Sequence, residues 1–182
     1  QITWIGYPGT TGIKAMDYIL MENTVLPGKN INAQFTEKII RIPRSYAFDV
    51  EEQLPDVTEA PCVNNNFITF GSFNRLNKIN REVIALWCEV LRKLPDSRLQ
   101  MAGMPSDGAP DELLTWFKEE EISEDRLYFY PRSGFVEYLK LHNQVDFCLD
   151  TFPYTGGTTT MHALWMGVPT LTLIGDTYPS AQ

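Results

Sequence analysis

The sequence predicts an α/β fold whose main part is a doubly wound parallel sheet. From Phe67 to the end of the 182-residue chain, short apolar runs alternate with amphipathic stretches in the order βαβαβαβαβ. Glycine and proline separate these segments, and right-handed crossovers between them would make all the strands parallel. The run Val145–Leu149 is apolar almost throughout, which is typical of a strand that helices cover on both faces.

The residues before Phe67 show a less regular pattern. A glycine-rich loop, Gly6–Gly12, is either a tight turn or a place where the backbone approaches a ligand. Prolines, acids and consecutive asparagines predict an irregular linker from Arg44 to Asn66, with a boundary between two parts near Pro55–Asn66. The expected elements are strands at Gln1–Ile5, Met16–Met21 and Ile39–Ile42 and a helical turn at Ala33–Lys38.

The regular part of the chain has clear helix boundaries. Asn80 can cap a helix that ends before Pro95, and Pro110 suits the first turn of the next helix. One of the threonines at 158–160 is expected to cap the last helix, and Gly167 ends it. The expected strands are Phe67–Phe73, Arg98–Ala102, Arg126–Tyr130, Val145–Leu149 and Thr170–Ile174, and the expected helices are Asn80–Leu94, Pro110–Glu120, Phe135–His142 and Met161–Met166.

The predicted topology places two loops at one edge of the sheet. With the common strand order 3-2-1-4-5, the first and fourth strands are neighbours, and ligands bind beyond their carboxyl ends. The loops that follow these strands are Gly71–Lys78 and Asp150–Thr158, which are rich in glycine, polar groups or a cation. The sequence therefore predicts a ligand crevice between two loops that lie far apart along the chain.

The second of these loops leads into the start of a helix. Gly156 and Gly157 let the backbone approach a ligand, and the helix start offers unpaired N–H groups and a positive partial charge. Such a site suits an anion, most often phosphate. The alternative is an ordinary strand-to-helix turn that needs glycine for its dihedral angles.

Lys78 and Arg75 are the cations of the first loop. Lys78 could neutralise a diphosphate held at Thr158–Thr159, and in a sugar transfer it would stabilise the leaving diphosphate. The alternative is a solvated surface lysine, which is the more common fate of a single lysine in a loop.

Several function classes lack their motifs in this sequence. No G-x-G-x-x-G follows the first strand of the sheet, and neither a P-loop G-K-[ST] nor G-x-S-x-G is present. These absences argue against nicotinamide dehydrogenases, nucleoside triphosphatases and serine hydrolases. Only His142 and His162 could act as an imidazole base; we expect His142 at the surface, and His162 in the crevice or facing solvent. No Asp-x-Asp pair is present to hold a metal on a diphosphate, so we expect no metal or other cofactor.

The composition limits the expected partners and location. A net charge of −8 disfavours a broad nucleic-acid surface, which needs clustered lysine and arginine. No apolar run is long enough to span a membrane, and no signal peptide is visible, so we expect no membrane partner. Cys62, Cys88 and Cys148 fit no zinc pattern, and we expect the last two in the core. Unpaired cysteines favour a reducing compartment and therefore a cytoplasmic location.

Three blocks of the sequence resemble the SPINDLY and O-GlcNAc transferase family, whose members are two-lobed (GT-B) glycosyltransferases. The most distinctive block, Cys148–Pro169, contains Gly-Gly-Thr-Thr and Leu-Trp-Met-Gly-Val-Pro; the others are Ile2–Thr10 with Met16–Ile19, and Phe70–Ile79. The resemblance implies a Rossmann-like carboxyl-terminal lobe, residues 61–182, truncated at its carboxyl end. Before it, residues 1–60 would be the end of the amino-terminal catalytic lobe and a linker.

The resemblance also implies roles for individual residues. Lys78 matches the catalytic lysine that contacts the donor diphosphate, and Arg75 lies near the phosphates where animal enzymes have glutamine. His162 departs from the family, which usually has an acidic residue there, and Gly157 replaces a histidine. The other implied donor contacts are Gly6, Tyr7 and Pro8 near the sugar, Ser133 and Tyr138 in the segment that binds the base, Gly157, Thr158 and Thr159 at the diphosphate, and His162 at the ribose.

The implied function is transfer of a sugar from a nucleotide-sugar donor to Ser or Thr of protein acceptors. UDP-GlcNAc is the expected donor, but Phe152–Tyr154 before the threonine run also resembles the plant SPINDLY branch and implies GDP-fucose. A different hypothesis is a non-catalytic scaffold that keeps the fold. The family's tetratricopeptide repeats, most of the amino-terminal lobe and the final helices are absent from this sequence. We therefore expect this chain alone to be inactive, and to retain weak nucleotide binding at best.

Overall fold

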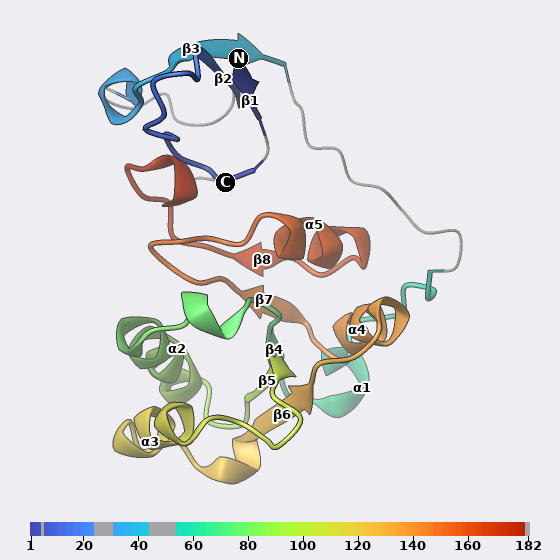
Figure 1. Cartoon of the computed structure of the whole chain (residues 1–182). Coiled ribbons are helices and arrows are strands. Elements are labelled where there is room, and N and C mark those ends of the chain that lie inside the picture. The colour runs from blue at the N-terminus through green and yellow to red at the C-terminus, as the bar shows by residue number, and fades with distance from the viewer. Residues whose placement is uncertain (5, 24–30, 44–53, 181–182) are drawn as a thin grey trace. The chain divides into compact units, whose positions relative to one another are not determined.

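The computed structural model describes residues 1–4, 6–23, 31–43 and 54–180 (Figure 1). It divides into two compact units. The small unit comprises Gln1–Asp49, Pro153–Thr155 and Leu173–Gln182, and the large unit comprises Val50–Phe152 and Gly156–Thr172. Each unit has its own parallel sheet. No helix in the described ranges is long and apolar enough to cross a membrane.

The small unit is a three-stranded sheet with the order β1-β2-β3. Its strands are β1 (Ile2–Thr3), β2 (Tyr18–Glu22) and β3 (Lys38–Ile42), and its 3-10 helices are η1 (Ile31–Gln34) and η4 (Tyr178–Ser180). Buried Met21 and Ile31 form its core with Phe35, Ile39 and Tyr178 packed against them. The helical turn expected at Ala33–Lys38 therefore lies earlier, because Lys38 already pairs with Tyr18 in the sheet.

The large unit is a five-stranded parallel sheet with the order β6-β5-β4-β7-β8. This is the order 3-2-1-4-5 along the chain, so the predicted strand order is confirmed. The strands are β4 (Thr69–Ser72), β5 (Arg98–Met104), β6 (Leu127–Pro131), β7 (Phe147–Leu149) and β8 (Thr170–Leu171). The helices are α1 (Cys62–Asn65), α2 (Arg81–Lys93), α3 (Asp111–Glu119), α4 (Phe135–His142) and α5 (Thr158–Trp165), with 3-10 turns η2 (Leu76–Lys78) and η3 (Glu124–Arg126).

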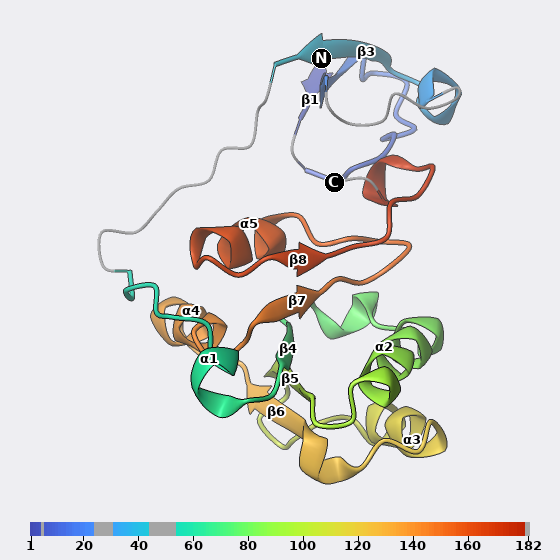
Figure 2. The same cartoon turned by 180° about the vertical axis from the view of Figure 1, so that it is seen from behind.

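Helices cover both faces of this sheet. In both views α2 and α3 lie on one face and α4 and α5 on the other (Figures 1 and 2). The alternation along β5 follows from this arrangement, because successive side chains of a strand point to opposite faces. Leu99 and Met101 join the core under α2 and α3, whereas Ala102 joins the core under α4 and α5.

Helix α2 shows how local sequence sets these elements. The side chain of Asn80 accepts a hydrogen bond from the amide of Val83 at 2.9 Å, which is the predicted N-cap. The inner face of α2 buries Val83, Ile84 and Trp87 against the sheet. Arg92 and Lys93 in the last turn complement the negative end of the helix dipole.

Three further expectations about secondary structure are wrong. The stretch expected to be irregular up to Asn66 contains α1, because Asn66 adopts a left-handed conformation (φ 61°) that closes a helical turn; residues 44–53 of that stretch lie outside the described residues. The last helix is capped by Gly157 without a side-chain hydrogen bond, since the threonines at 158–160 already lie inside α5. The last strand ends at Leu171 rather than Ile174, because the chain from Leu173 onward belongs to the small unit.

The position of α1 depends on one buried carboxylate. Asp146 accepts a hydrogen bond from the amide of Cys62 at the start of α1 and another from the amide of Thr69 at the start of β4, both at 2.8 Å. Asp146 is only 6% exposed. Its two oxygens therefore satisfy two backbone donors that water reaches poorly.

We expect Asp146→Ala to lower the free energy of unfolding by about 2–4 kcal/mol, because two buried N–H groups lose a charged acceptor. Urea unfolding followed by circular dichroism measures this change. Glu89→Ala on the exposed side of α2 is the matched control and should change stability by less than about 0.5 kcal/mol. Equal stability of the two variants would contradict the structural role of Asp146.

Candidate active site

The carboxyl ends of β4 and β7 form the centre of the candidate site. These strands are direct neighbours, with Phe70 opposite Phe147 and Gly71 opposite Cys148. A side chain at Gly71 would not fit, because its Cβ would lie 2.9 Å from Val145 and 3.1 Å from Phe73. The loops after these two strands therefore begin side by side.

The carboxylate of Asp150 connects the loops at this edge. Its Oδ1 accepts hydrogen bonds from the amides of Thr151 (2.8 Å) and Gly156 (2.7 Å) and from the side-chain amide of Asn74 (3.1 Å). Its Oδ2 accepts one from the hydroxyl of Thr172 at 2.8 Å. Asp150 is only 6% exposed, so these bonds form in a largely dry environment where they hold the loops firmly.

Asn74 extends this hydrogen-bond network to helix α5. Its Oδ1 accepts a hydrogen bond from the hydroxyl of Thr159 at 3.1 Å, while its Nδ2 donates to Asp150. Asn74 belongs to the loop after β4, and Thr159 lies in the first turn of α5. The predicted convergence of the two loops on one edge of the sheet is thus confirmed.

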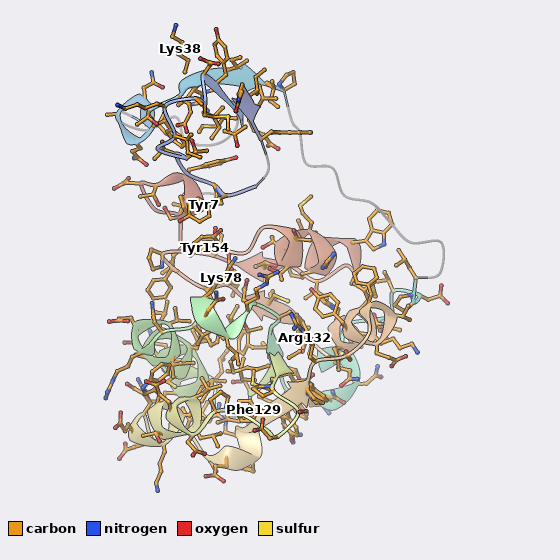
Figure 3. The ribbon with its side chains drawn as sticks, viewed as in Figure 1. Tyr7, Lys38, Lys78, Phe129, Arg132 and Tyr154 are labelled. Carbon is orange, nitrogen blue, oxygen red and sulfur yellow. The ribbon has the colours of Figure 1, made fainter. Side chains whose placement is uncertain are left out.

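Lys78 lies in this loop, in the 3-10 turn η2 that precedes α2 (Figure 3). Its side chain is about half buried, and this burial lowers the pKa of Lys78; the negative charge of Asp150 opposes the shift, and Arg75 adds to it. Lys78 is thus within electrostatic range of the same carboxylate that organises the loops. Arg75 is exposed.

A side chain at position 156, just before α5, would not fit. A Cβ at Gly156 would lie 2.6 Å from the hydroxyl of Thr159 and 3.1 Å from Asp150 Oδ1. Gly157 is the N-cap, and Thr158 is exposed in the first turn. The first amides of a helix have no acceptor within it, so this end of α5 can donate to an anion.

An aromatic cluster lies between α4 and α5. The hydroxyl of Tyr138 is 3.1 Å from Nδ1 of His162, and its ring contacts Phe73 edge-on at 5.8 Å between centroids. Burial raises the pKa of Tyr138, so its phenol keeps the proton, and the tautomer of His162 sets which of the two groups donates. Burial also lowers the pKa of His162, which favours the neutral imidazole. Ser133 is exposed in the segment before α4.

His142 belongs to this cluster, and the expectation that it lies at the surface is wrong. It is fully buried, because the last turn of α4 faces the sheet, and its ring stacks on Phe73 at 4.0 Å. Its Nδ1 lies 3.2 Å from the carbonyl of Tyr138, and among the described residues its Nε2 has no hydrogen-bond partner. Burial lowers the pKa of His142 to about 4.

Gly6, Tyr7 and Pro8 belong to the small unit, whereas the other candidate residues belong to the large unit. Tyr7 is exposed, and its ring lies 6.3 Å from that of Tyr154 in the same unit (Figure 3). Gly6 is exposed and Pro8 is buried.

Sequence reasoning predicted that Lys78 and the threonines lie at this edge of the sheet, but it missed the hydrogen-bond network of Asn74 and Asp150. Asp150 was interpreted only as the end of a strand. A carboxylate at the end of a buried strand, followed by a glycine-containing loop, is the signal that could have indicated it, because such a loop has amides that need an acceptor.

Comparison with known families gives a match over nearly the whole chain. The pattern of glycosyl transferase family 41 matches residues 1–67 and 53–181. The chain belongs to this family. A probable UDP-N-acetylglucosamine–peptide N-acetylglucosaminyltransferase SPINDLY of Hordeum vulgare is 35% identical over 98% of this chain. The corresponding protein of Arabidopsis thaliana is 34% identical over the same share.

The chain spans only 19% of the Hordeum relative and 20% of the Arabidopsis relative. Among solved structures, a mutant of the Thermobaculum terrenum O-GlcNAc transferase is similar over 99% of this chain and 34% of its own, with a TM-score of 0.85 and 33% identity. The family resemblance and the α/β fold class expected from the sequence are therefore both confirmed.

The buried His142 gives the fold a pH dependence. Its pKa in the fold lies below the ordinary value of 6.5, so the unfolded chain binds more protons between about pH 6.5 and 4. Stability should therefore fall as pH decreases through this window, by up to about 3 kcal/mol from this residue, and be unaffected by it above the window.

His142→Gln keeps an amide that can donate to the Tyr138 carbonyl but does not titrate. We expect its free energy of unfolding, measured in urea from pH 7.5 to 4.5, to fall less steeply than that of the unmodified chain. Parallel curves for the two proteins would exclude a buried neutral imidazole at this position.

Proposed function

We propose that this chain is the donor-binding part of a protein O-glycosyltransferase that uses UDP-GlcNAc. The observation that carries the proposal is the Asn74 bridge, which joins the Lys78 loop to Asp150 and to the first turn of α5. This bridge supports a single anion site, with the cation Lys78 on one side and the first amides of α5 on the other. The printed names of the plant relatives, probable UDP-N-acetylglucosamine–peptide N-acetylglucosaminyltransferases, support the choice of donor and of protein acceptors.

In this proposal the donor diphosphate is held by the amides at Gly157, Thr158 and Thr159. Lys78, assisted by Arg75, neutralises the charge that grows on the diphosphate as the bond to the sugar breaks. A cation placed at a developing charge stabilises the transition state more than the ground state, which is what accelerates a reaction. Lys78 would thereby serve in place of a metal ion.

The remaining candidates would orient the donor. Ser133 and Tyr138 would contact the base, His162 the ribose, and Gly6, Tyr7 and Pro8 the sugar. The proposed donor-binding lobe begins near residue 61. We also propose a cytoplasmic location, since Cys62, Cys88 and Cys148 are free thiols.

Nucleotide choice tests the proposal directly. Titration calorimetry of this chain with UDP and with GDP should give saturable binding that is tighter for UDP. Tighter binding of GDP would replace UDP-GlcNAc by GDP-fucose as the donor. Absence of binding, or equal binding of both nucleotides, would count against a nucleotide-sugar site.

Lys78→Ala should weaken UDP binding by about tenfold or more, because it removes a charge-assisted contact worth about 1.5–3 kcal/mol. The thermal unfolding midpoint should change little, since the lysine is not part of the core. Lys118→Ala, at an exposed position of α3, removes the same charge and is the matched control. An unchanged dissociation constant in Lys78→Ala would rule out this lysine as a diphosphate ligand.

A further inference from the structure

The turn η2, which contains Lys78, is anchored within the large unit at both of its ends. Before the turn, the side chain of Asn74 donates a hydrogen bond to Asp150 Oδ1 at 3.1 Å. After the turn, the side chain of Asn80 donates through its Nδ2 to the main-chain carbonyl of Phe152 at 3.4 Å. Two asparagines, one on each side of Lys78, therefore join this turn to the loop that follows β7.

The side-chain amide of Asn80 makes a second hydrogen bond at its other end. Its Oδ1 accepts from the main-chain amide of Val83 at 2.9 Å and so caps α2. A main-chain N–H can only donate and a main-chain carbonyl can only accept, so the two bonds agree on which end of this side chain is nitrogen. Asn80 thus connects the start of α2 with the Phe152 carbonyl of the neighbouring loop.

Apolar side chains around Lys78 hold the same turn on the core under α2 and α3. Ile79 is buried in this core, and Leu76 packs against it. Phe152, whose carbonyl accepts from Asn80, packs against the same core. The backbone at Lys78 is therefore held by its neighbours, which matters because a lysine side chain is long and flexible. The position of its ammonium group depends on how firmly the backbone is held.

Helix α2, which begins at Arg81 just after this turn, also contacts the loop after β7 further along its length. The indole Nε1 of Trp87 donates to the main-chain carbonyl of Asp150 at 3.2 Å, and Trp87 is only 2% exposed. Trp87 would keep α2 on the sheet if the bond from Asn80 to the loop were lost. Loss of that bond would therefore loosen only the end of α2 that is next to Lys78.

We propose that Asn80 is a positioning residue for the donor site, whose bond to the Phe152 carbonyl holds Lys78 where it meets the diphosphate. This inference rests on the proposed function, because it requires a ligand that Lys78 binds. Asn80 does not touch the ligand; it acts through the short stretch of backbone between it and Lys78. A cation that is held in place before the ligand arrives loses less entropy on binding, so the bond contributes to the affinity for UDP.

Asn80→Ser separates the two roles of this side chain. Serine caps helices about as well as asparagine, but it is too short to reach the Phe152 carbonyl. Titration calorimetry should give about three- to tenfold weaker UDP binding, and the thermal unfolding midpoint should stay within about 1 °C of that of the unmodified chain. Asn80→Ala loses both bonds, so it should weaken UDP binding equally and lower the midpoint by about 2–4 °C. Asn77→Ser, at an exposed position of the same turn, is the matched control and should change neither.

A double-mutant cycle shows whether Asn80 acts through Lys78. In the Lys78→Ala background, Asn80→Ser should change the dissociation constant of UDP by less than about twofold, because the group that Asn80 positions is gone. A general structural effect would instead weaken UDP binding by the same factor with or without the lysine. An equal loss in the two backgrounds would therefore overturn the proposal.

Hydrogen exchange tests the same bond without any ligand. The main-chain amides of Lys78 and Ile79 donate to carbonyls within the turn at 2.9 Å, and they should exchange about fivefold faster in Asn80→Ser than in the unmodified chain. Unchanged exchange of both amides would overturn the role of Asn80.

The outcomes separate this inference from the proposed function. UDP binding that Lys78→Ala weakens and Asn80→Ser leaves unchanged would overturn the role of Asn80 and keep the donor site. Absence of UDP binding by the unmodified chain would overturn both.

Discussion

A single buried carboxylate determines the geometry of one edge of the large unit. Asp150 ends β7 and accepts hydrogen bonds from the loop after β4, from its own loop and from the residue that follows β8. Its main-chain carbonyl also accepts the indole N–H of Trp87 from α2, at 3.2 Å. The loop with Lys78 and the first turn of α5 therefore take their positions from one side chain. An acceptor shared in this way is difficult to replace, because each of its partners would lose a bond that water cannot easily supply.

The parallel sheet gives its two edges different chemistry. At the carboxyl edge, loops converge and offer backbone donors and a half-buried lysine. At the amino edge, strand starts present side chains directly, and Arg98 and Gln100 on β5 face a pocket instead of the core. Both residues occupy the same face of β5, since they are two positions apart. The neighbouring Leu99 points into the core under α2 and α3, so one strand serves the core and the pocket at once.

Much of this architecture could be predicted from local patterns, because those patterns act over a few residues. The cap at Asn80, the helix Phe135–His142 and the strand order all follow from periodicity, turn residues and the handedness of crossovers. Long-range pairings could not be predicted in this way. The burial of His142 depends on Phe73, and the side-chain amide of Gln100 donates to the carbonyl of Gln144 after α4. A polar residue near a helix end has the same local pattern whether a sheet or solvent lies beside it.

The bonded residues lie far apart in the sequence, which affects the order in which the chain folds. Asn74 and Asp150 are 76 residues apart, and Thr172 follows Asp150 by a further 22. Closing such long loops has an entropic cost that no contact inside them offsets until the central strands pair. We therefore expect the network at Asp150 to form late in folding, after β4 and β7 have paired. In a nascent chain whose Thr172 is still inside the ribosome, the loop with Lys78 and the first turn of α5 would lack the bond from Thr172 to Asp150.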